Sequence, residues 1–173
     1  MEQSRGTIIR LTKLTETSLI VHWMTEKAGL IKTVAKGARR AQSSFAGRLD
    51  LFIEAELEWN RSSRSELHAL REVTVIDFRE PLRKNYRDAV IAAYFGQLLE
   101  LVLELDHPIP EMADLLSRGL SYLQSSGADR KAFLHFEKEV SRLLGLGQSA
   151  QESLIQSYGH LPKSRDHCLD LLS

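Results

Sequence analysis

The chain has little cysteine and proline, no excess of charge of either sign and no long apolar run. Cys168 is the one cysteine among 173 residues, which excludes an intrachain disulfide and is typical of a reducing cytoplasm. No apolar run approaches the roughly 20 residues of a membrane span. Residues 1–5 lead into a strand-like segment without the apolar core of a signal peptide. We therefore expect a cytoplasmic protein that does not cross a membrane.

The charge balance of the whole chain hides a difference between its halves. Residues 1–84 hold 15 Lys and Arg against 11 Asp and Glu, a net charge of +4, and residues 85–173 hold 8 against 12, a net charge of −4. Six basic residues and no acidic residue lie in the segment 27–48, called here the basic segment: Lys27, Lys32, Lys36, Arg39, Arg40 and Arg48. One sign of charge concentrated in this way is what binding a polyanion requires.

The spacing of apolar residues changes once along the chain. Before about residue 80 the period is near two, which predicts strands over 6–14, 18–25, 30–37, 49–59 and 66–77. Short turns separate these strands, apart from one longer basic loop. Five such strands predict a small antiparallel barrel.

After Pro81 the period is near 3.6, which predicts a series of helices. His107 to Pro110 ends the first long helix, because proline cannot continue its hydrogen-bond ladder. Asp129 is expected to cap a later helix, and Ser149 with Glu152 matches a capping box. The sequence thus predicts an α+β chain with a barrel domain over 1–80 and a helical domain over 81–173.

The basic segment has the pattern of a nucleic-acid surface. Lys32 and Lys36 share a strand face with Val34, and Arg39 and Arg40 follow in a loop that begins at Gly37. Cations on a small barrel, with an aromatic ring for stacking, form a platform for single strands. Phe45 is the candidate ring, and anchoring of the loop to the core is an equal alternative for it. The charges could also merely keep the protein soluble.

Signals of enzyme chemistry are weak. Glu54, Glu56 and Glu58 form a carboxylate ladder, which more often marks a solvated sheet face than acid–base chemistry. His160, His167 and Cys168 do not have the spacing of a closed zinc site, and Cys168 is expected to be a small core residue. No nucleophile elbow, phosphate-binding loop or HExxH pattern is present. We predict no enzyme activity, no metal and no cofactor.

Several motifs resemble the DNA repair protein RecO family. The basic segment contains GLIKTVAKGARR (29–40), followed by Ser44-Phe45 and by Leu49 to Phe52, and this pattern is similar to the family's N-terminal domain. Residues 86–105 and 136–145 are similar to its helices, and 161–165 to its final segment. A cysteine-rich zinc insertion that many members carry is missing, because 145–161 is short and lacks cysteine.

The resemblance implies an OB-fold followed by a helical domain. It also implies binding of single- and double-stranded DNA, annealing of complementary strands, and cooperation with RecR and single-stranded-DNA-binding protein to load the RecA recombinase at gaps. Such a protein is expected to be cytoplasmic and associated with the nucleoid. Lys32, Lys36, Arg39 and Arg40 match the family motif as DNA contacts, and Arg48 is added on charge alone.

Two other functional hypotheses remain open from the sequence. In the first, the barrel is a docking surface of a protein-interaction adaptor that does not bind DNA directly. In the second, less favoured, the glutamate ladder serves a nuclease-like enzyme.

Overall fold

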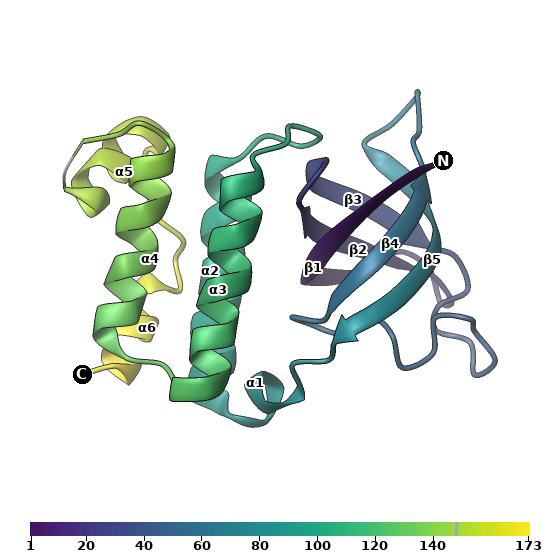
Figure 1. Cartoon of the computed structure of the whole chain (residues 1–173), viewed down its shortest axis with the longest axis horizontal. Coiled ribbons are helices and arrows are strands. Elements are labelled where there is room, and N and C mark those ends of the chain that lie inside the picture. The colour runs from purple at the N-terminus through teal and green to yellow at the C-terminus, as the bar shows by residue number, and fades with distance from the viewer. Residues whose placement is uncertain (148) are drawn as a thin grey trace. The chain divides into compact units, whose positions relative to one another are not determined.

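The computed structural model describes residues 1–147 and 149–173, which form two compact units. The barrel unit comprises residues 1–80 together with 104–113, and the helical unit comprises 81–103 together with 114–173. The chain runs through five strands and then through helices, as the sequence predicts, and Figure 1 shows this order. The second segment of the barrel unit is remote in sequence from the first, and each unit has its own core.

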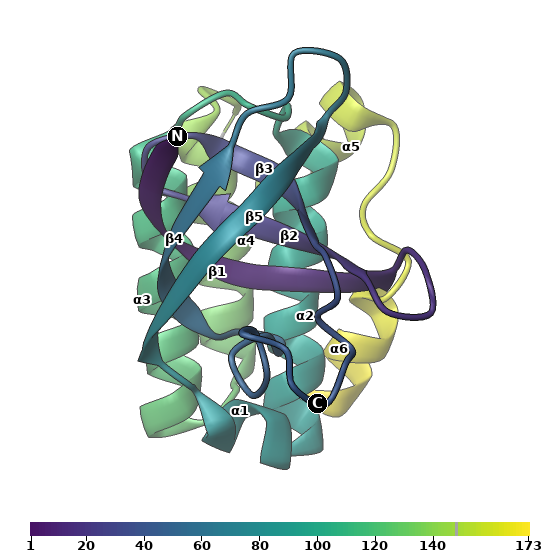
Figure 2. The ribbon, with the colours of Figure 1, turned by 90° about the vertical axis from the view of Figure 1, so that its right-hand side faces the viewer.

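The barrel closes in the strand order β1-β2-β3-β5-β4, which is the topology of an OB-fold. Figure 2 views it from the side on which β4 and β5 lie. The strands are β1 (Glu2–Lys13), β2 (Leu19–Thr25), β3 (Gly29–Ala35), β4 (Glu54–Asn60) and β5 (Leu67–Asp77).

One strand pairing departs from the predicted antiparallel barrel. β3 and β5 run parallel, with Lys32 opposite Leu67 and Val34 opposite Ala69, whereas the other pairings are antiparallel. A closed ring of five strands cannot alternate direction all the way round, because five is odd. At least one parallel pair is therefore required, and β3 with β5 supplies it.

The barrel interior is apolar and is filled from all five strands. Trp23 is completely buried, and its indole Nε1 donates a hydrogen bond of 2.9 Å to Thr33 Oγ1, which satisfies the ring's polar atom. The buried cluster consists of Ile8, Val21, Trp23, Ala28, Ile31, Ala35, Phe45, Ile53, Ala55, Leu57, Trp59, Leu70 and Val73.

The predicted strand over 49–59 begins later than expected, at Glu54. Phe52 has a φ of 70°, in the left-handed region that side chains rarely adopt, so the extended strand cannot include it. Its N–H donates to the Ile8 carbonyl at 2.8 Å, and the Ile8 N–H donates to the Ile53 carbonyl at 2.9 Å. Residues 49–53 are therefore a turn fastened to β1.

The segment 104–113 packs on the barrel at the start of β3. Leu105 forms a parallel bridge with Leu30, and the Asp106 N–H donates to the Leu30 carbonyl at 2.8 Å. The approach is closest at Gly29, where a Cβ would lie 2.0 Å from the His107 carbonyl oxygen. Glycine is required there by this contact and by its φ of 72°.

The helices match the predicted pattern closely. They are α1 (Glu80–Lys84), α2 (Tyr86–Val102), α3 (Pro110–Ser126), α4 (Arg130–Leu143), α5 (Ala150–Tyr158) and α6 (Arg165–Leu171). The Asp129 side chain accepts a hydrogen bond from the Ala132 N–H, which confirms the predicted cap of α4. Ser149 occupies the predicted N-cap of α5, but its side chain makes no capping bond, so the capping-box prediction is wrong in that detail.

The helical unit contains an aromatic stack and a buried ion pair. Phe95 and Phe136 stack with their ring centroids 3.8 Å apart. The Arg165 guanidinium donates to both carboxylate oxygens of Glu137, at 2.6 and 2.9 Å, and the Tyr94 hydroxyl donates to the same carboxylate. Burial and this carboxylate raise the pKa of Tyr94 far above its usual range. These bonds join α6 to α4 and α2.

Candidate nucleic-acid interface

The basic segment forms the outer face of β3 and the loop that follows. Ile31, Thr33 and Ala35 are buried, whereas Lys32 and Val34 are only half-buried. The lysine therefore lies on the outward face with Val34, as the alternation predicts. Lys36, Arg39, Arg40 and Arg48 are exposed.

The loop after β3 is fastened to the barrel at several points. Phe45 is only 8% exposed and belongs to the barrel core, so its role is to anchor the loop. This finding decides against the alternative of a stacking ring at Phe45. The Gly37 N–H donates to Ser18 Oγ at 3.1 Å, and the Arg39 N–H donates to the Thr17 carbonyl at 2.9 Å. The loop that carries Arg39 and Arg40 is therefore held against the barrel.

The five predicted DNA contacts differ in their partners. Within the part of the chain that the structure describes, the side chains of Lys36 and Arg40 have no hydrogen-bond or ion-pair partner. Arg39 Nη1 donates to the Glu16 carbonyl at 3.1 Å, and Arg48 Nη1 donates to the Val73 carbonyl at 3.2 Å. Neutral carbonyls orient these two guanidinium groups without cancelling their charge. Of the five, Lys32 alone pairs with a carboxylate in the described ranges, that of Glu66, at 3.6 Å.

The predicted contacts are spread over the barrel, and Arg48 lies apart from Lys32. Lys32 is opposite Leu67 at the start of β5, and Arg48 contacts Val73 six residues further along. At about 3.3 Å per residue the two positions are roughly 20 Å apart along the strand. Arg39 instead contacts Glu16 and Thr17 in the turn between β1 and β2, so the predicted contacts lie on both sides of β3.

Sequence reasoning missed two residues beside Lys32. Arg10 of β1 pairs in register with His22 of β2, and His22 pairs with Lys32 of β3, so the three lie in a row across the strands. A bulge between Ile8 and Arg10 sets this register. The alternation of Arg10 and His22 with apolar neighbours was the available signal, but the sequence does not reveal which strands are adjacent.

The glutamate ladder is not the uniformly solvated face that the sequence predicts. Glu56 and Glu58 are half-buried, but Glu54 is buried between two arginines. Arg79 Nη2 donates to Glu54 Oε2 at 2.5 Å, and the Arg5 guanidinium bonds the other carboxylate oxygen. Burial lowers the pKa of Arg79, and the Glu54 carboxylate opposes that shift. Glu54 is thus held in a structural ion pair, which removes the geometric basis for the nuclease-like reading.

Cys168 and the histidines do not form a reactive or metal-binding centre in the described residues. Cys168 is completely buried, which confirms the prediction of a core residue, and burial raises the pKa of its thiol to about 11. A protonated, inaccessible thiol is inert as a nucleophile. Across residues 1–147 and 149–173, no group of three or more His, Cys, Asp or Glu side chains could hold a metal ion.

The helical unit carries a second candidate surface, a groove between α3 and α4. Its volume is about 640 Å³, and Phe95, Gly119 and Phe136 contribute to its lining. Basic side chains surround this apolar floor: Arg118 from α3, and Lys131, His135 and Lys138 from α4. The positions 131, 135 and 138 follow helical spacing, and this signal was readable in the sequence. The net charge of −4 over residues 85–173 conceals this local basic cluster.

None of the helices in the described ranges is long and apolar enough to cross a lipid bilayer.

The strand order of the barrel and the helices that follow it define an OB-fold protein with a helical extension. Residues 1–79 match the family model described as recombination protein O N terminal. The DNA repair protein RecO of Rhodopirellula baltica is 28% identical over 155 residues, covering 86% of this chain and 55% of that protein. RecO of Syntrophotalea carbinolica is 30% identical (75% and 50% covered), and RecO of Pasteurella multocida is 32% identical (83% and 58% covered). The chain belongs to the RecO family.

These matches confirm the family and the fold that the sequence predicted. The chain spans between 50% and 58% of the length of these three relatives. The names of these relatives describe DNA repair.

Proposed function

We propose that this chain acts in DNA repair and recombination by binding single- and double-stranded DNA and annealing complementary strands. With RecR and single-stranded-DNA-binding protein, it helps to load the RecA recombinase at single-stranded gaps. The single observation that supports the DNA-binding part is the exposure of Lys36, Arg39, Arg40 and Arg48 on a loop that Phe45 anchors to the barrel, next to Lys32 on β3. Such a protein is associated with the nucleoid.

The proposed mechanism is neutralisation of phosphates. Lys and Arg side chains that contact phosphates release the counterions condensed on the DNA, and they reduce the repulsion between two approaching strands. Lys36 and Arg40 are the strongest candidates, because their charges have no competing partner in the described residues. The carbonyl contacts of Arg39 and Arg48 orient two further cations in advance. No base-reading groove is needed, so the binding is independent of sequence.

A salt titration of binding tests this function. Three to four phosphate contacts on single-stranded DNA give a log–log salt slope of roughly −2 to −3, from about −0.7 per neutralised phosphate. The measurement is fluorescence anisotropy of a labelled oligonucleotide and of its duplex, without partner proteins. Absence of binding at low salt by the folded chain would reject direct DNA contact and favour the adaptor reading.

The groove of the helical unit supports a second function, docking of a partner protein. Its apolar floor and basic rim fit a segment that combines acidic residues with an apolar side chain, and we propose that RecR or single-stranded-DNA-binding protein supplies it. Leu134 of α4 also lines the groove and is exposed, so Lys138→Glu with Leu134→Glu should weaken binding of that partner while DNA affinity stays unchanged. Binding of both partners at wild-type strength would exclude the groove.

A further inference from the structure

Among the described residues, Lys32 is the one predicted DNA contact that already has an anionic partner. Its Nζ lies 3.6 Å from the Glu66 carboxylate, and the side chains are 32% and 69% exposed respectively. The parallel pairing of β3 with β5 causes this contact, because it places Lys32 opposite Leu67, the residue after Glu66. Glu66 therefore occupies a position where a phosphate would meet Lys32.

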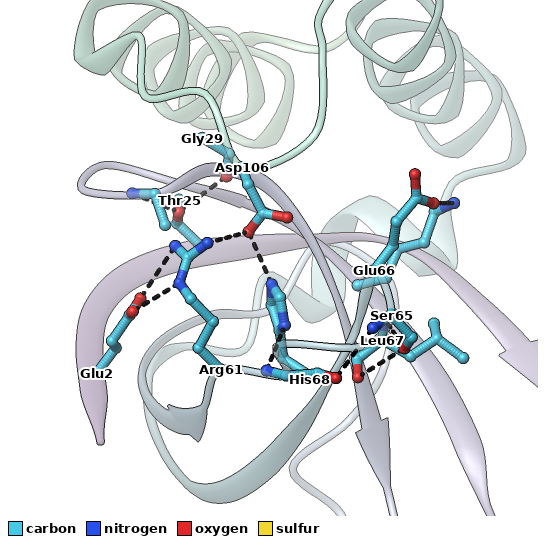
Figure 3. A network of polar contacts seen from close by, with 12 residues as sticks. Glu2, Thr25, Gly29, Arg61, Ser65, Glu66, Leu67, His68 and Asp106 are labelled. Carbon is cyan, nitrogen blue, oxygen red and sulfur yellow. Dashed lines mark hydrogen bonds and ion pairs between the residues drawn. The ribbon is translucent and has the colours of Figure 1, made fainter.

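The backbone beside Glu66 is held by polar contacts on both sides (Figure 3). Ser65 Oγ accepts a hydrogen bond of 2.9 Å from the Leu67 N–H. The His68 ring accepts the Ser62 N–H at Nδ1, and its Nε2 lies 2.7 Å from Asp106 Oδ1.

A second contact fastens the other end of the β4–β5 loop. Arg61 contacts Asp106 at 3.2 Å and pairs with Glu2 at 2.7 Å. These contacts involve β1, β5 and the segment 104–113, so the loop is tied to three parts of the barrel unit. The position of Glu66 opposite Lys32 is thus a built feature of the fold.

We propose that Glu66 is an intramolecular competitor of nucleic-acid phosphate for Lys32, and so a residue that sets affinity and selectivity. This inference rests on the proposed DNA-binding function. Within the ion pair the charges of Lys32 and Glu66 cancel, so Lys32 adds little net charge to the interface in the free protein. A phosphate engages Lys32 only by displacing the carboxylate.

The competition favours long polyanions over small anions. A single phosphate that displaces Glu66 exchanges one solvent-exposed ion pair for another, and such pairs are weak. A nucleic-acid strand held already by Lys36, Arg39 and Arg40 brings its next phosphate to Lys32 at a high effective concentration. Removal of the Glu66 charge should therefore strengthen binding and relax this discrimination.

The test compares the salt slopes of five proteins: the wild type, Glu66→Gln, Lys32→Gln, the double variant of both, and Glu72→Gln. Glu72 is an exposed glutamate on β5 opposite Glu58, so its replacement makes the same change in net charge away from Lys32. The probe is a labelled single-stranded oligonucleotide, with a mononucleotide as competitor. Lys36→Gln is measured in parallel as a report on the DNA site itself.

Glu66→Gln should tighten binding by roughly two- to fivefold at low salt, the range of a weak exposed ion pair. It should also steepen the salt slope by about 0.7, the value of one phosphate contact. Lys32→Gln should change the wild-type slope little but abolish the gain in the Glu66→Gln background. The mononucleotide should compete more effectively against Glu66→Gln than against the wild type.

Two results would overturn the proposal. If Glu66→Gln and Glu72→Gln change the affinity and the salt slope equally, the effect of Glu66 is one of net charge and not of competition for Lys32. If the salt slope of Glu66→Gln equals that of the wild type while the slope of Lys36→Gln is flatter, Glu66 does not compete with phosphate. The DNA site itself would still be supported by that result. If Lys36→Gln also has no effect, the proposed DNA site itself fails, and the role of Glu66 fails with it.

Discussion

Two charge-rich regions of the barrel unit, the basic segment and the β4 glutamates, look alike in the sequence and differ in the structure. Lys36 and Arg40 are exposed and have no partner among the described residues, whereas Glu54 is buried between Arg5 and Arg79. An exposed, unpartnered charge contributes little to stability and is available to a ligand. A buried, paired charge is costly to disrupt and unavailable. The partner of a charge, more than its residue type, therefore separates a binding role from a structural one.

The largest effect is expected from a substitution that breaks the buried ion pair of Glu54 with Arg79. Glu54→Ala leaves the Arg79 guanidinium buried without its main carboxylate, which should destabilise the protein by about 3–5 kcal/mol. Glu58→Ala on the same strand is the control and should change the stability by less than about 0.5 kcal/mol, because Glu58 is half-buried and faces Glu72. Urea unfolding measures both. Equal losses in the two variants would contradict the contrast drawn between them.

The basic segment should show the opposite behaviour. Lys36→Glu with Arg39→Glu should flatten the log–log salt slope of single-strand binding by about 1.4, or about 0.7 for each lost contact. Annealing should fall with affinity, while the stability changes by no more than about 0.5 kcal/mol per substitution. Anisotropy, an annealing assay and urea unfolding provide the three readings. Wild-type binding and annealing by the folded variant would show that DNA binds elsewhere.

The buried thiol of Cys168 extends the contrast between buried and exposed groups to the helical unit, and the pH dependence of stability tests it. Burial raises the Cys168 pKa to about 11 in the folded protein, from 9.0 as its ordinary value. Above pH 9 the unfolded chain loses this proton first, so the stability from Cys168 is complete below pH 9 and is lost as pH rises toward 11. The loss is on the order of 2 kcal/mol, at about 1.4 kcal/mol per pKa unit.

Urea unfolding at several pH values, compared with Cys168→Ala, isolates this contribution from that of Tyr94. A constant difference between the two proteins from pH 8 to 11 would rule it out. Alkylation of the wild-type thiol at pH 8 should be slow in the folded protein and fast in urea.

The smallest expected effect concerns two helix caps. Asp129→Ala removes the bond to the Ala132 N–H and should cost about 1 kcal/mol, whereas Ser149→Ala removes no capping bond and should cost less. The hydrogen bond from Tyr122 and the capping bond lower the pKa of Asp129. Its contribution should thus be lost as pH falls through that lowered value, below the ordinary value of 3.8. Thermal unfolding of both variants at pH 7 and at acid pH checks the order and the sign.

Much of the fold was predictable because it depends on local patterns. The period-two alternation located the strands, Pro81 marked the change to helices, and Asp129 began α4 as expected. The start of β4 was not predictable, because the positive φ of Phe52 follows from bonds to Ile8 in a remote strand. The parallel pair of β3 and β5 follows from the odd number of strands, a property of the closed barrel as a whole.

The sequence by itself determined the periodicity of the elements, the local excess of positive charge and the motifs of the RecO family, because each is carried by neighbouring residues. Only the tertiary structure decided which charged side chains form ion pairs within the protein. It buried Glu54 beside Arg5 and Arg79, and it placed Glu66 against Lys32. Strand register brings together residues separated by tens of positions, and burial sets the cost of leaving them unpaired. Neither property is present in a linear pattern of charges.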